Sequence, residues 1–257
     1  MKKKYQSIID IVFHILLFAG FLLLWQMLCM LKILPEYMLP SPLKVFQAFI
    51  NDFSLLMSHG KVTIYETFAG LIAGTVLGFI LAVIMDCFGW VYKCLYPMLI
   101  VSQTIPTVAL APLLVLWMGY GVAPKITLIV LIVFFPIAAC LIDGFQSADK
   151  DEIRLLETMG AGKIQIFYHI KLPGSIGNFF SGLRISVAYA VVGAVISEWL
   201  GGYKGLGVYM TRVKKSYSYD KMFAVIFLIS LLSLLLIKLV DLANKAAMPW
   251  RKEEIKM

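Results

Sequence analysis

Long apolar runs recur along this chain, and they constrain its fold more than any other feature. A run of about 18 or more apolar residues with few charges is long enough to cross the hydrocarbon core of a bilayer as a helix. A helix is favoured there because it satisfies every backbone polar group within the segment. The sequence therefore predicts an all-α integral membrane protein, a single transmembrane domain over 1–257 with six transmembrane helices at about 8–31, 62–84, 92–118, 125–142, 176–200 and 222–242.

The composition supports a membrane protein rather than a soluble one. Of the 257 residues, 61% are hydrophobic and only 15% are charged, whereas a soluble domain is about half apolar and about a quarter charged. The net charge of +8 does not indicate nucleic-acid binding, because most basic residues lie in loops and tails beside the spans. There they set orientation and meet the anionic headgroups of the lipid bilayer. The four cysteines form no CxxC pair and show no metal-ligand spacing.

The basic N-terminus, Met1-Lys-Lys-Lys-Tyr, precedes the first apolar run. A secretory signal has an apolar region of about 7–15 residues that ends at a small-residue cleavage site. The run 8–31 is longer and carries no Ala-x-Ala site, so we expect it to be retained as a first span. Six spans then place both termini on the cytoplasmic side. The loops assigned to that side hold slightly more Lys and Arg, as the positive-inside rule requires.

The second predicted span contains a ridge of glycines, Gly70, Gly74 and Gly78. Small residues at this spacing let two helices approach closely in lipid, so we expect the ridge to pack against another helix. Glu66 lies one turn before the ridge, and a snorkelling or paired carboxylate is expected there rather than a substrate ligand. In the fifth span, Arg184 is expected to be a snorkelling anchor rather than a substrate contact.

Prolines interrupt the third apolar stretch at Pro97, Pro106 and Pro112. Each removes a helix hydrogen bond, and the freed carbonyl needs a partner in protein or water. The polar residues beside the middle break are Ser102, Gln103 and Thr104. Together with Pro106 they are candidates to line a translocation pathway, and simple kinked packing is the equally weighted alternative.

The loop 143–175 is the only long part of the chain that mixes many charges with an amphipathic pattern, and apolar spans flank it. Asp149 and Glu152 resemble a capping box that begins a helix. Gly160 and Gly162 are expected to end that helix, because glycine is the usual residue at a helix C-terminus.

A second short helix is predicted in the same loop over Lys163–Ile170, ending at Leu172-Pro173. The product is two short helices joined by a glycine elbow between two spans. Such an element could be gripped by a soluble protein as a lever. From periodicity alone, an amphipathic loop resting on lipid headgroups is an equal alternative.

The spacing at the end of this loop resembles a known signature. Gly160, nine residues and then Ile170-Lys171-Leu172-Pro173 match the end of the pattern Glu-Ala-Ala, three residues, Gly, nine residues, Ile-x-Leu-Pro. That pattern marks permease subunits of binding-protein-dependent ABC importers. The Glu-Ala-Ala start is replaced here by Arg154-Leu155-Leu156, so Glu152 or Glu157 would have to supply the acidic contact.

The resemblance covers roughly Leu39 to Leu242 and is similar to the nitrate, sulfonate, taurine and thiamine-precursor class of these permeases. The stretches that carry it are LPSPLKV, IPTVALAPLLVLWMGYG, GLRISVAYA, and SEW followed by GLGVYM. The class implies a methionine-importer-like permease fold in the bacterial cytoplasmic membrane. It also implies a homodimer that works with two ATPase subunits and an extracytoplasmic substrate-binding protein.

In such importers this loop is a coupling helix that sits in a groove of the ATPase. The residues that the resemblance assigns to ATPase coupling are Glu152, Arg154, Glu157, Gly160, Ile170, Leu172 and Pro173. The chain has no GxxxxGK(S/T) motif, so ATP and Mg²⁺ are expected on the partner ATPase. We therefore expect a transport subunit rather than an enzyme, with no catalytic residue, metal or cofactor of its own.

The resemblance also suggests a gate and a solute. Glu198 matches an acidic position of the class and is expected to position the outer gate, with plain helix-end solvation as the alternative. The solute would be a thiamine-pyrimidine or riboflavin-type precursor, or a sulfonate such as taurine. An ion-coupled secondary transporter is the alternative function because Glu66 and Glu198 are intramembrane carboxylates, although paired interrupted helices would then be normal. A membrane enzyme would need clustered side chains, but the histidines are scattered over separate elements at His14, His59 and His169.

Overall fold

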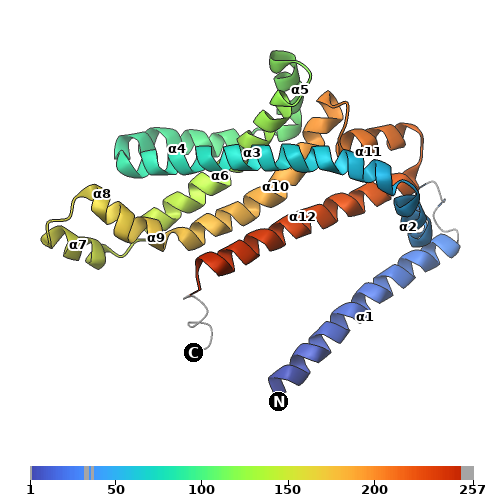
Figure 1. The fold of residues 1–257 in the computed structure, drawn as a ribbon, viewed down its shortest axis with the longest axis horizontal. Helices are drawn as coiled ribbons and strands as arrows, with labels where there is room; N and C mark the ends of the chain where they lie inside the picture. The colour runs from blue at the N-terminus through green and yellow to red at the C-terminus, as the bar shows by residue number, and fades with distance from the viewer. Residues whose placement is uncertain (1, 32–34, 36–37, 250–257) are drawn as a thin grey trace. The chain divides into compact units, whose positions relative to one another are not determined.

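The computed structural model describes residues 2–31, 35 and 38–249, and every regular element in that part of the chain is helical. The two ends of the predicted domain 1–257, at residue 1 and residues 250–257, lie outside the described residues. In chain order (Figure 1) the helices are α1 Lys2–Met30, α2 Pro42–Asn51, α3 Phe53–Cys87, α4 Gly89–Gln103, α5 Thr107–Met118, α6 Ala123–Gln146, α7 Lys150–Thr158, α8 Lys163–Ile166, the π-helical turn η1 Phe167–Lys171, α9 Leu172–Gly174, α10 Ile176–Gly201, α11 Leu206–Lys215 and α12 Tyr219–Ala247.

The chain divides into two compact units. Unit 1 comprises Met1–Ser58 and Tyr209–Leu228, and unit 2 comprises His59–Val208 and Ile229–Met257. Helices α3, α11 and α12 therefore contribute to both units. All the residues that the sequence singles out for coupling, pathway, gate or helix packing lie in unit 2.

Several helices are suited to a membrane by length and composition. Four of them can cross a bilayer, at Phe53–Cys87, Ala123–Gln146, Ile176–Leu200 and Tyr219–Ala247, and α4 with α5 forms a fifth candidate if that bent pair is one span. The first predicted span, 8–31, lies within α1 except for its last residue, and the apolar part of α1 that the described residues delimit is the shorter stretch Ala19–Met30. Six spans therefore remain a prediction. The fourth predicted span is part of a longer helix that continues to Gln146.

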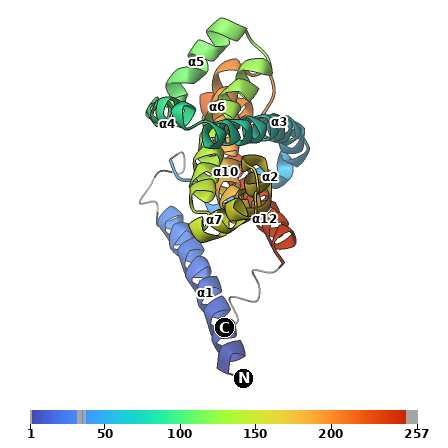
Figure 2. The ribbon, with the colours of Figure 1, turned by 90° about the vertical axis from the view of Figure 1, so that its left-hand side faces the viewer.

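The core of unit 2 is built around α6. Its residues Ile129, Val133 and Ile137 are fully buried, and α10 runs beside it along much of its length (Figures 1 and 2). The glycine ridge of α3 faces the same three residues. An added Cβ at each of these glycines would come within 2.5–2.8 Å of an α6 atom, at Gly70, Gly74 and Gly78. Close approach of α3 and α6 therefore requires glycine at these positions.

The third predicted span is bent rather than straight. Helices α4 and α5 meet at 100° across residues 104–106. Pro106 lies outside both helices in an extended conformation, with φ −61° and ψ 119°, and a proline disfavours helical backbone at the residue before it. Pro97 and Pro112 lie within helices, so only the middle proline coincides with the bend.

Unit 1 is held together by an aromatic cluster and an ion pair. The Trp25 ring lies 5.9 Å from Phe223 and 6.1 Å from Phe227, measured between centroids. At the start of α3, the Asp52 carboxylate accepts a hydrogen bond from the Tyr209 hydroxyl and pairs with the Lys221 ammonium at 2.8 Å. These two donors, Lys221 first, hold the pKa of Asp52 below its usual value.

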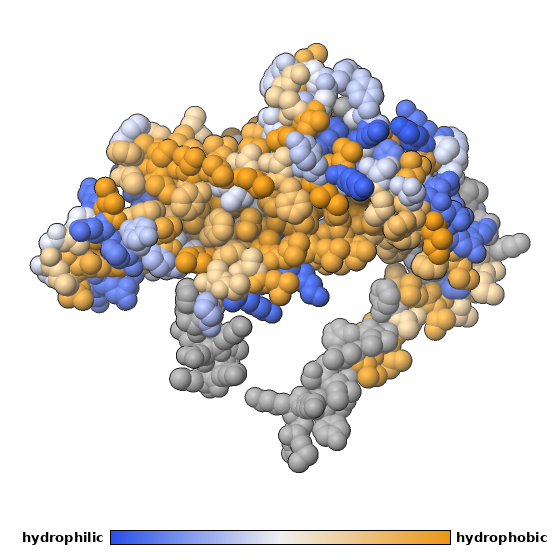
Figure 3. Space-filling view, in the orientation of Figure 1, coloured by the Kyte–Doolittle hydropathy of each residue, from blue (hydrophilic) through white to orange (hydrophobic). Residues whose placement is uncertain are grey.

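Exposed side chains distinguish the long helices from the segment around α7. Large apolar residues are solvent-accessible along α3, among them Ile72 at 61% and Val76 at 53%. Hydrophobic residues cover much of the visible face along the long helices, whereas hydrophilic residues gather around α7 and α8 (Figure 3). An apolar exterior of this extent fits a lipid environment, because soluble monomers rarely expose such large apolar patches.

Candidate functional site

Three features of unit 2 are candidates for function, and the first is the segment Lys150–Gly174, which we call the elbow segment. Asp149 caps α7 by accepting a hydrogen bond from the Asp151 backbone N–H at 2.8 Å. A capping box would require Asp149 to accept from the backbone N–H of Glu152. Asp149 instead accepts from that of Asp151. Gly160 follows the end of α7 with φ +85°, a backbone conformation that glycine adopts without strain.

The second half of the elbow segment differs from the prediction. The helix that begins at Lys163 does not end at Leu172-Pro173, because α8, η1 and α9 follow one another without a break through Gly174. The prediction of a helix end at this position is therefore wrong. Pro173 lies in the first turn of α9, where its missing N–H costs little. The π-helical turn is where the chain changes register before α10, and such turns are frequent at functional sites.

Exposed apolar side chains mark the surface of the elbow segment, at one end of unit 2 (Figure 1). They are Leu155 at 62%, Met159 at 75%, Ile164 at 84% and Tyr168 at 65% exposure. Glu152, Arg154 and Glu157 are also exposed. Among the residues that the structure describes, Arg154 pairs only with Asp151 of its own helix, at 3.5 Å between two largely exposed side chains. The segment therefore presents apolar and charged groups together, which suits a protein partner.

The elbow segment is fixed to the long helices at its other end. Lys171 forms an ion pair with Asp86, near the end of α3, at 2.7 Å. The ring of Phe167 lies edge-on to Phe145 of α6, 5.2 Å between centroids, and Ile166 is buried. Leu172, one of the predicted coupling residues, packs against the same core. These contacts join the second half of the elbow segment to α3 and α6.

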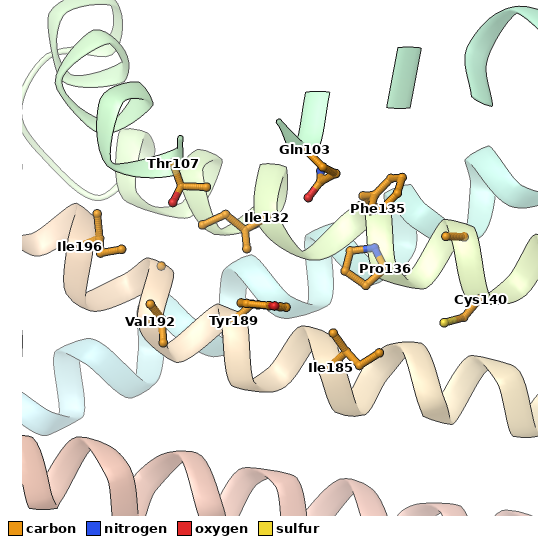
Figure 4. A pocket seen from close by; sticks show the side chains of 12 residues that line it. Gln103, Thr107, Ile132, Phe135, Pro136, Cys140, Ile185, Tyr189, Val192 and Ile196 are labelled. Carbon is orange, nitrogen blue, oxygen red and sulfur yellow. The ribbon is translucent and has the colours of Figure 1, made fainter. Parts of the chain in front are cut away.

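The second feature is a cavity of about 560 Å³ between the α4–α5 bend, α6 and α10 (Figure 4). Its volume lies in the range of about 300–1,000 Å³ that is usual for small-molecule sites. The lining residues are Gln103, Thr107, Ile132, Phe135, Pro136, Ala139, Cys140, Ile185, Tyr189, Val192, Gly193 and Ile196. Of the predicted pathway residues at the bend, only Gln103 lines this cavity. The hydroxyls of Ser102 and Thr104 bond to carbonyls of their own helix, at 2.7 and 2.8 Å.

The third feature is a buried polar cluster, formed by His59, Thr63, Glu66, Lys125 and Glu198. All five are at most 4% exposed. The Lys125 ammonium donates to one Glu66 oxygen at 2.7 Å, so Glu66 is a paired carboxylate, one of the two expected forms. Within the described part of the chain, its other oxygen has no hydrogen-bond partner.

Glu198 lies against the end of the α10–α11 loop and binds the first turn of α11. One carboxylate oxygen accepts from the Thr63 hydroxyl at 2.7 Å and the other from the Gly207 N–H at 2.6 Å. The Leu206 N–H donates to Thr63 at 2.9 Å. Because Glu198 is 1% exposed, the alternative of plain helix-end solvation is wrong.

Glycines make the contact between this loop and Glu198 possible. Gly205 has φ +134°, and a side chain there would overlap the Glu198 carboxylate. Its N–H donates to the His59 imidazole at 3.0 Å. The backbone at Gly205 therefore passes close to Glu198 just before α11 begins, in a way that a larger residue would block.

The structure also bears on Arg184, on metal binding and on residues that the sequence analysis did not single out. Arg184 pairs with Asp241 at 3.4 Å, with 61% of its side chain exposed. No group of three or more His, Cys, Asp or Glu side chains in the described residues could hold a metal ion. Sequence reasoning missed Lys125, Thr63, His59 and the Asp86–Lys171 pair. Lys125 could have been found from one signal, its place at the start of an apolar span. A charge in a span usually pairs with another, so this lysine predicts an acidic partner.

Comparison with known proteins places this arrangement in a protein family. Residues 74–251 match the family described as "Binding-protein-dependent transport system inner membrane component". The formylaminopyrimidine transport permease protein ThiX of Halalkalibacterium halodurans is 36% identical, over 99% of this chain and 100% of that protein. The riboflavin transport system permease protein RibX of Chloroflexus aurantiacus is 29% identical, over 89% of this chain and 86% of its own length.

A solved structure shares the fold. A chain of the MetNI methionine ABC transporter in an inward-facing conformation aligns with a TM-score of 0.65 and 20% identity. The alignment covers 75% of this chain and 96% of that one. The methionine-importer-like permease fold is therefore confirmed.

Proposed function

The chain belongs to the family of binding-protein-dependent transport system inner membrane components, and from that premise we propose that it passes a small heteroaromatic solute inward through the cavity of unit 2. Membership makes the chain a permease subunit of an ABC importer, a transport subunit rather than an enzyme, with ATP hydrolysed by a separate subunit. It also decides against the ion-coupled secondary transporter.

Family membership implies some of the partners of this chain. A binding-protein-dependent permease works with an ATPase and a substrate-binding protein in the inner membrane. We propose in addition that two copies form a homodimer and that both termini are cytoplasmic. ATP and Mg²⁺ would then bind only to the ATPase subunits. The three lysines at the N-terminus support this orientation.

We propose that the elbow segment is the ATPase-coupling element. The observation that carries this assignment is its exposed apolar surface, Leu155 and Met159 on α7 and Ile164 on α8, joined at Gly160 and fixed to α3 through Lys171 and Asp86. Closure of the ATPases on ATP would move α7, and the ion pair would carry that movement to α3. Exposed Glu152 and Glu157 are the acids available for a basic partner surface.

Glu198 is proposed to position the outer gate. Glu198 binds the first turn of α11 and Thr63 of α3, so that both of its carboxylate oxygens are engaged. Movement of α3 or α10 would change these bonds, since Thr63 lies on α3 and Glu198 on α10. Gln103 and Pro106 are assigned to the translocation pathway. Gln103 lines the cavity, and Pro106 causes the α4–α5 bend.

The proposed solute is a pyrimidine of the thiamine-precursor type. Support comes from the relative named for formylaminopyrimidine, which matches nearly the whole chain, and from the relative named for riboflavin, another nitrogen heteroaromatic.

An ATPase assay tests this proposal. The permease is purified in nanodiscs with its ATPase, and the cognate binding protein is added with or without formylaminopyrimidine. Loaded binding protein should raise ATP hydrolysis several-fold. Hydrolysis that does not respond to the loaded binding protein would contradict the proposed function.

A further inference from the structure

We propose that the cavity between the α4–α5 bend, α6 and α10 is a solute-binding site of the permease itself, selective for an uncharged planar heteroaromatic ring that Gln103 recognises. This inference rests on the proposed function, because it takes the cavity to lie on the transport pathway. It goes further in naming the residues that select the solute and in excluding the sulfonate class.

The absence of charge in the cavity is the first argument. Among its twelve lining residues, all of them described, none is Lys, Arg, His, Asp or Glu. Of the charged side chains elsewhere in these helices, Lys125 pairs with Glu66 and Arg184 with Asp241, and neither Lys93 nor Asp143 lines the cavity. A sulfonate such as taurine would enter an apolar site without a counter-charge, which is costly. The N-terminal end of α5 near Thr107 offers only a partial positive charge.

Two uncommitted polar groups are the second argument. Gln103 and Tyr189 line the cavity, and no hydrogen bond joins either side chain to the rest of the described chain. Figure 4 shows Gln103 and Thr107 entering from the α4–α5 side and Tyr189 from α10 on the opposite side. Polar groups at membrane depth need a partner. A solute with its own donors and acceptors can provide one.

The chemistry of Gln103 fits one class of solute. Its side-chain amide offers one acceptor and one donor side by side. An aminopyrimidine presents the complementary pair, a ring nitrogen acceptor beside an exocyclic amino donor, which is the same kind of pair that glutamine reads on adenine. The rings of Phe135 and Tyr189 offer faces for stacking. A taurine molecule has no ring and no such edge.

Direct binding to the assembled transporter tests this assignment. The permease–ATPase complex in nanodiscs, without binding protein, is titrated with radiolabelled 4-amino-5-hydroxymethyl-2-methylpyrimidine, and separately with taurine. We expect saturable binding of the pyrimidine and at least tenfold weaker binding of taurine. Gln103→Ala should weaken pyrimidine binding about tenfold, and Tyr189→Leu about fivefold or more, as expected from a lost hydrogen bond and a lost stacking face.

Ser102→Ala is the matched control. Its hydroxyl donates to the Leu99 carbonyl of the same helix, at 2.7 Å, and Ser102 does not line the cavity. This variant should bind the pyrimidine like the wild type. Equal binding of the pyrimidine by wild type and Gln103→Ala, or taurine binding as tight as pyrimidine binding, would overturn the inference.

The failure of this inference is separable from that of the proposed function. ATPase stimulation by loaded binding protein reports import, whereas binding without binding protein reports the cavity alone. Stimulation that persists while the complex binds no free pyrimidine would overturn the cavity site and leave the importer intact.

Discussion

Glu66 and Lys125 are 59 positions apart in the sequence, yet their charged atoms meet at 2.7 Å in the interior of unit 2. Both side chains are at most 5% exposed. Removing one partner of a buried pair leaves an uncompensated charge, and the cost is about 3–5 kcal/mol. The pair therefore fixes how α3 and α6 meet.

Lys125→Met tests this requirement. It should lower the free energy of unfolding in detergent by about 3–5 kcal/mol, because Glu66 loses its counter-charge. The double variant Glu66→Gln with Lys125→Met should recover part of the loss. Arg184→Met is the control, since the Arg184 side chain is 61% exposed and its pair should contribute about 1 kcal/mol or less. A Lys125→Met protein as stable as wild type would refute the claim.

Glu198→Gln tests the gate. The amide keeps the size of the carboxylate but offers only one acceptor to the two donors, Thr63 and Gly207, so one charged hydrogen bond is lost, worth about 1.5–3 kcal/mol. Uptake should fall about tenfold or more while the ATPase still co-purifies. Ser197→Ala is the control, because its buried hydroxyl bonds only to its own helix. Wild-type uptake by Glu198→Gln would remove Glu198 from the gate.

Sequence reasoning reached these residues unevenly. It expected Glu66 to be a snorkelling or paired carboxylate, because a charge within an apolar span is informative by itself. The family resemblance made Glu198 a candidate gate residue. It did not find Lys125 or Thr63 as their partners. Those contacts depend on which helices pack together, and the spacing of residues within one segment does not show which helices do so.

At the scale of elements, the two halves of the elbow segment have different causes. Local sequence determines the ends of α7, whereas packing against other helices determines the part that follows. Asp149 and Gly160 bound α7 as their chemistry predicts. The continuation through Pro173 was not predicted, because it depends on the packing of Phe167 against Phe145 of α6 and on the burial of Ile166. In the same way, three prolines predicted a broken third span, but its angle of 100° follows from contacts with α6 and α10.

Gly160→Val tests the elbow as a docking element. Valine at φ +85° is strained, at a cost of about 1–2 kcal/mol or more, so α7 should lose its orientation. We expect normal membrane insertion and loss of co-purification with the tagged ATPase. Gly162→Val is a matched control in the same elbow, since Gly162 has φ −77° and its nearest neighbour would be 3.9 Å from an added Cβ. Equal ATPase yield from both variants would contradict the assignment.

At the scale of the whole molecule, the three candidate sites lie on shared helices. Helix α3 carries Asp86 at the elbow end and Thr63 and Glu66 in the polar cluster. Helix α10 carries Tyr189 in the cavity and Glu198. Apolar runs and the Gly160–Pro173 spacing were sufficient to predict the membrane fold and the permease family. The cavity was beyond prediction because α4, α5, α6 and α10 each contribute only a few of its residues.

Uptake into proteoliposomes tests the central claim most directly. The permease and its ATPase are reconstituted with ATP in the lumen, and binding protein loaded with radiolabelled formylaminopyrimidine is added outside. We predict accumulation only when ATP, ATPase and binding protein are all present, with no effect of collapsing ion gradients. Accumulation that persists without ATP and disappears with the ion gradient would contradict the account.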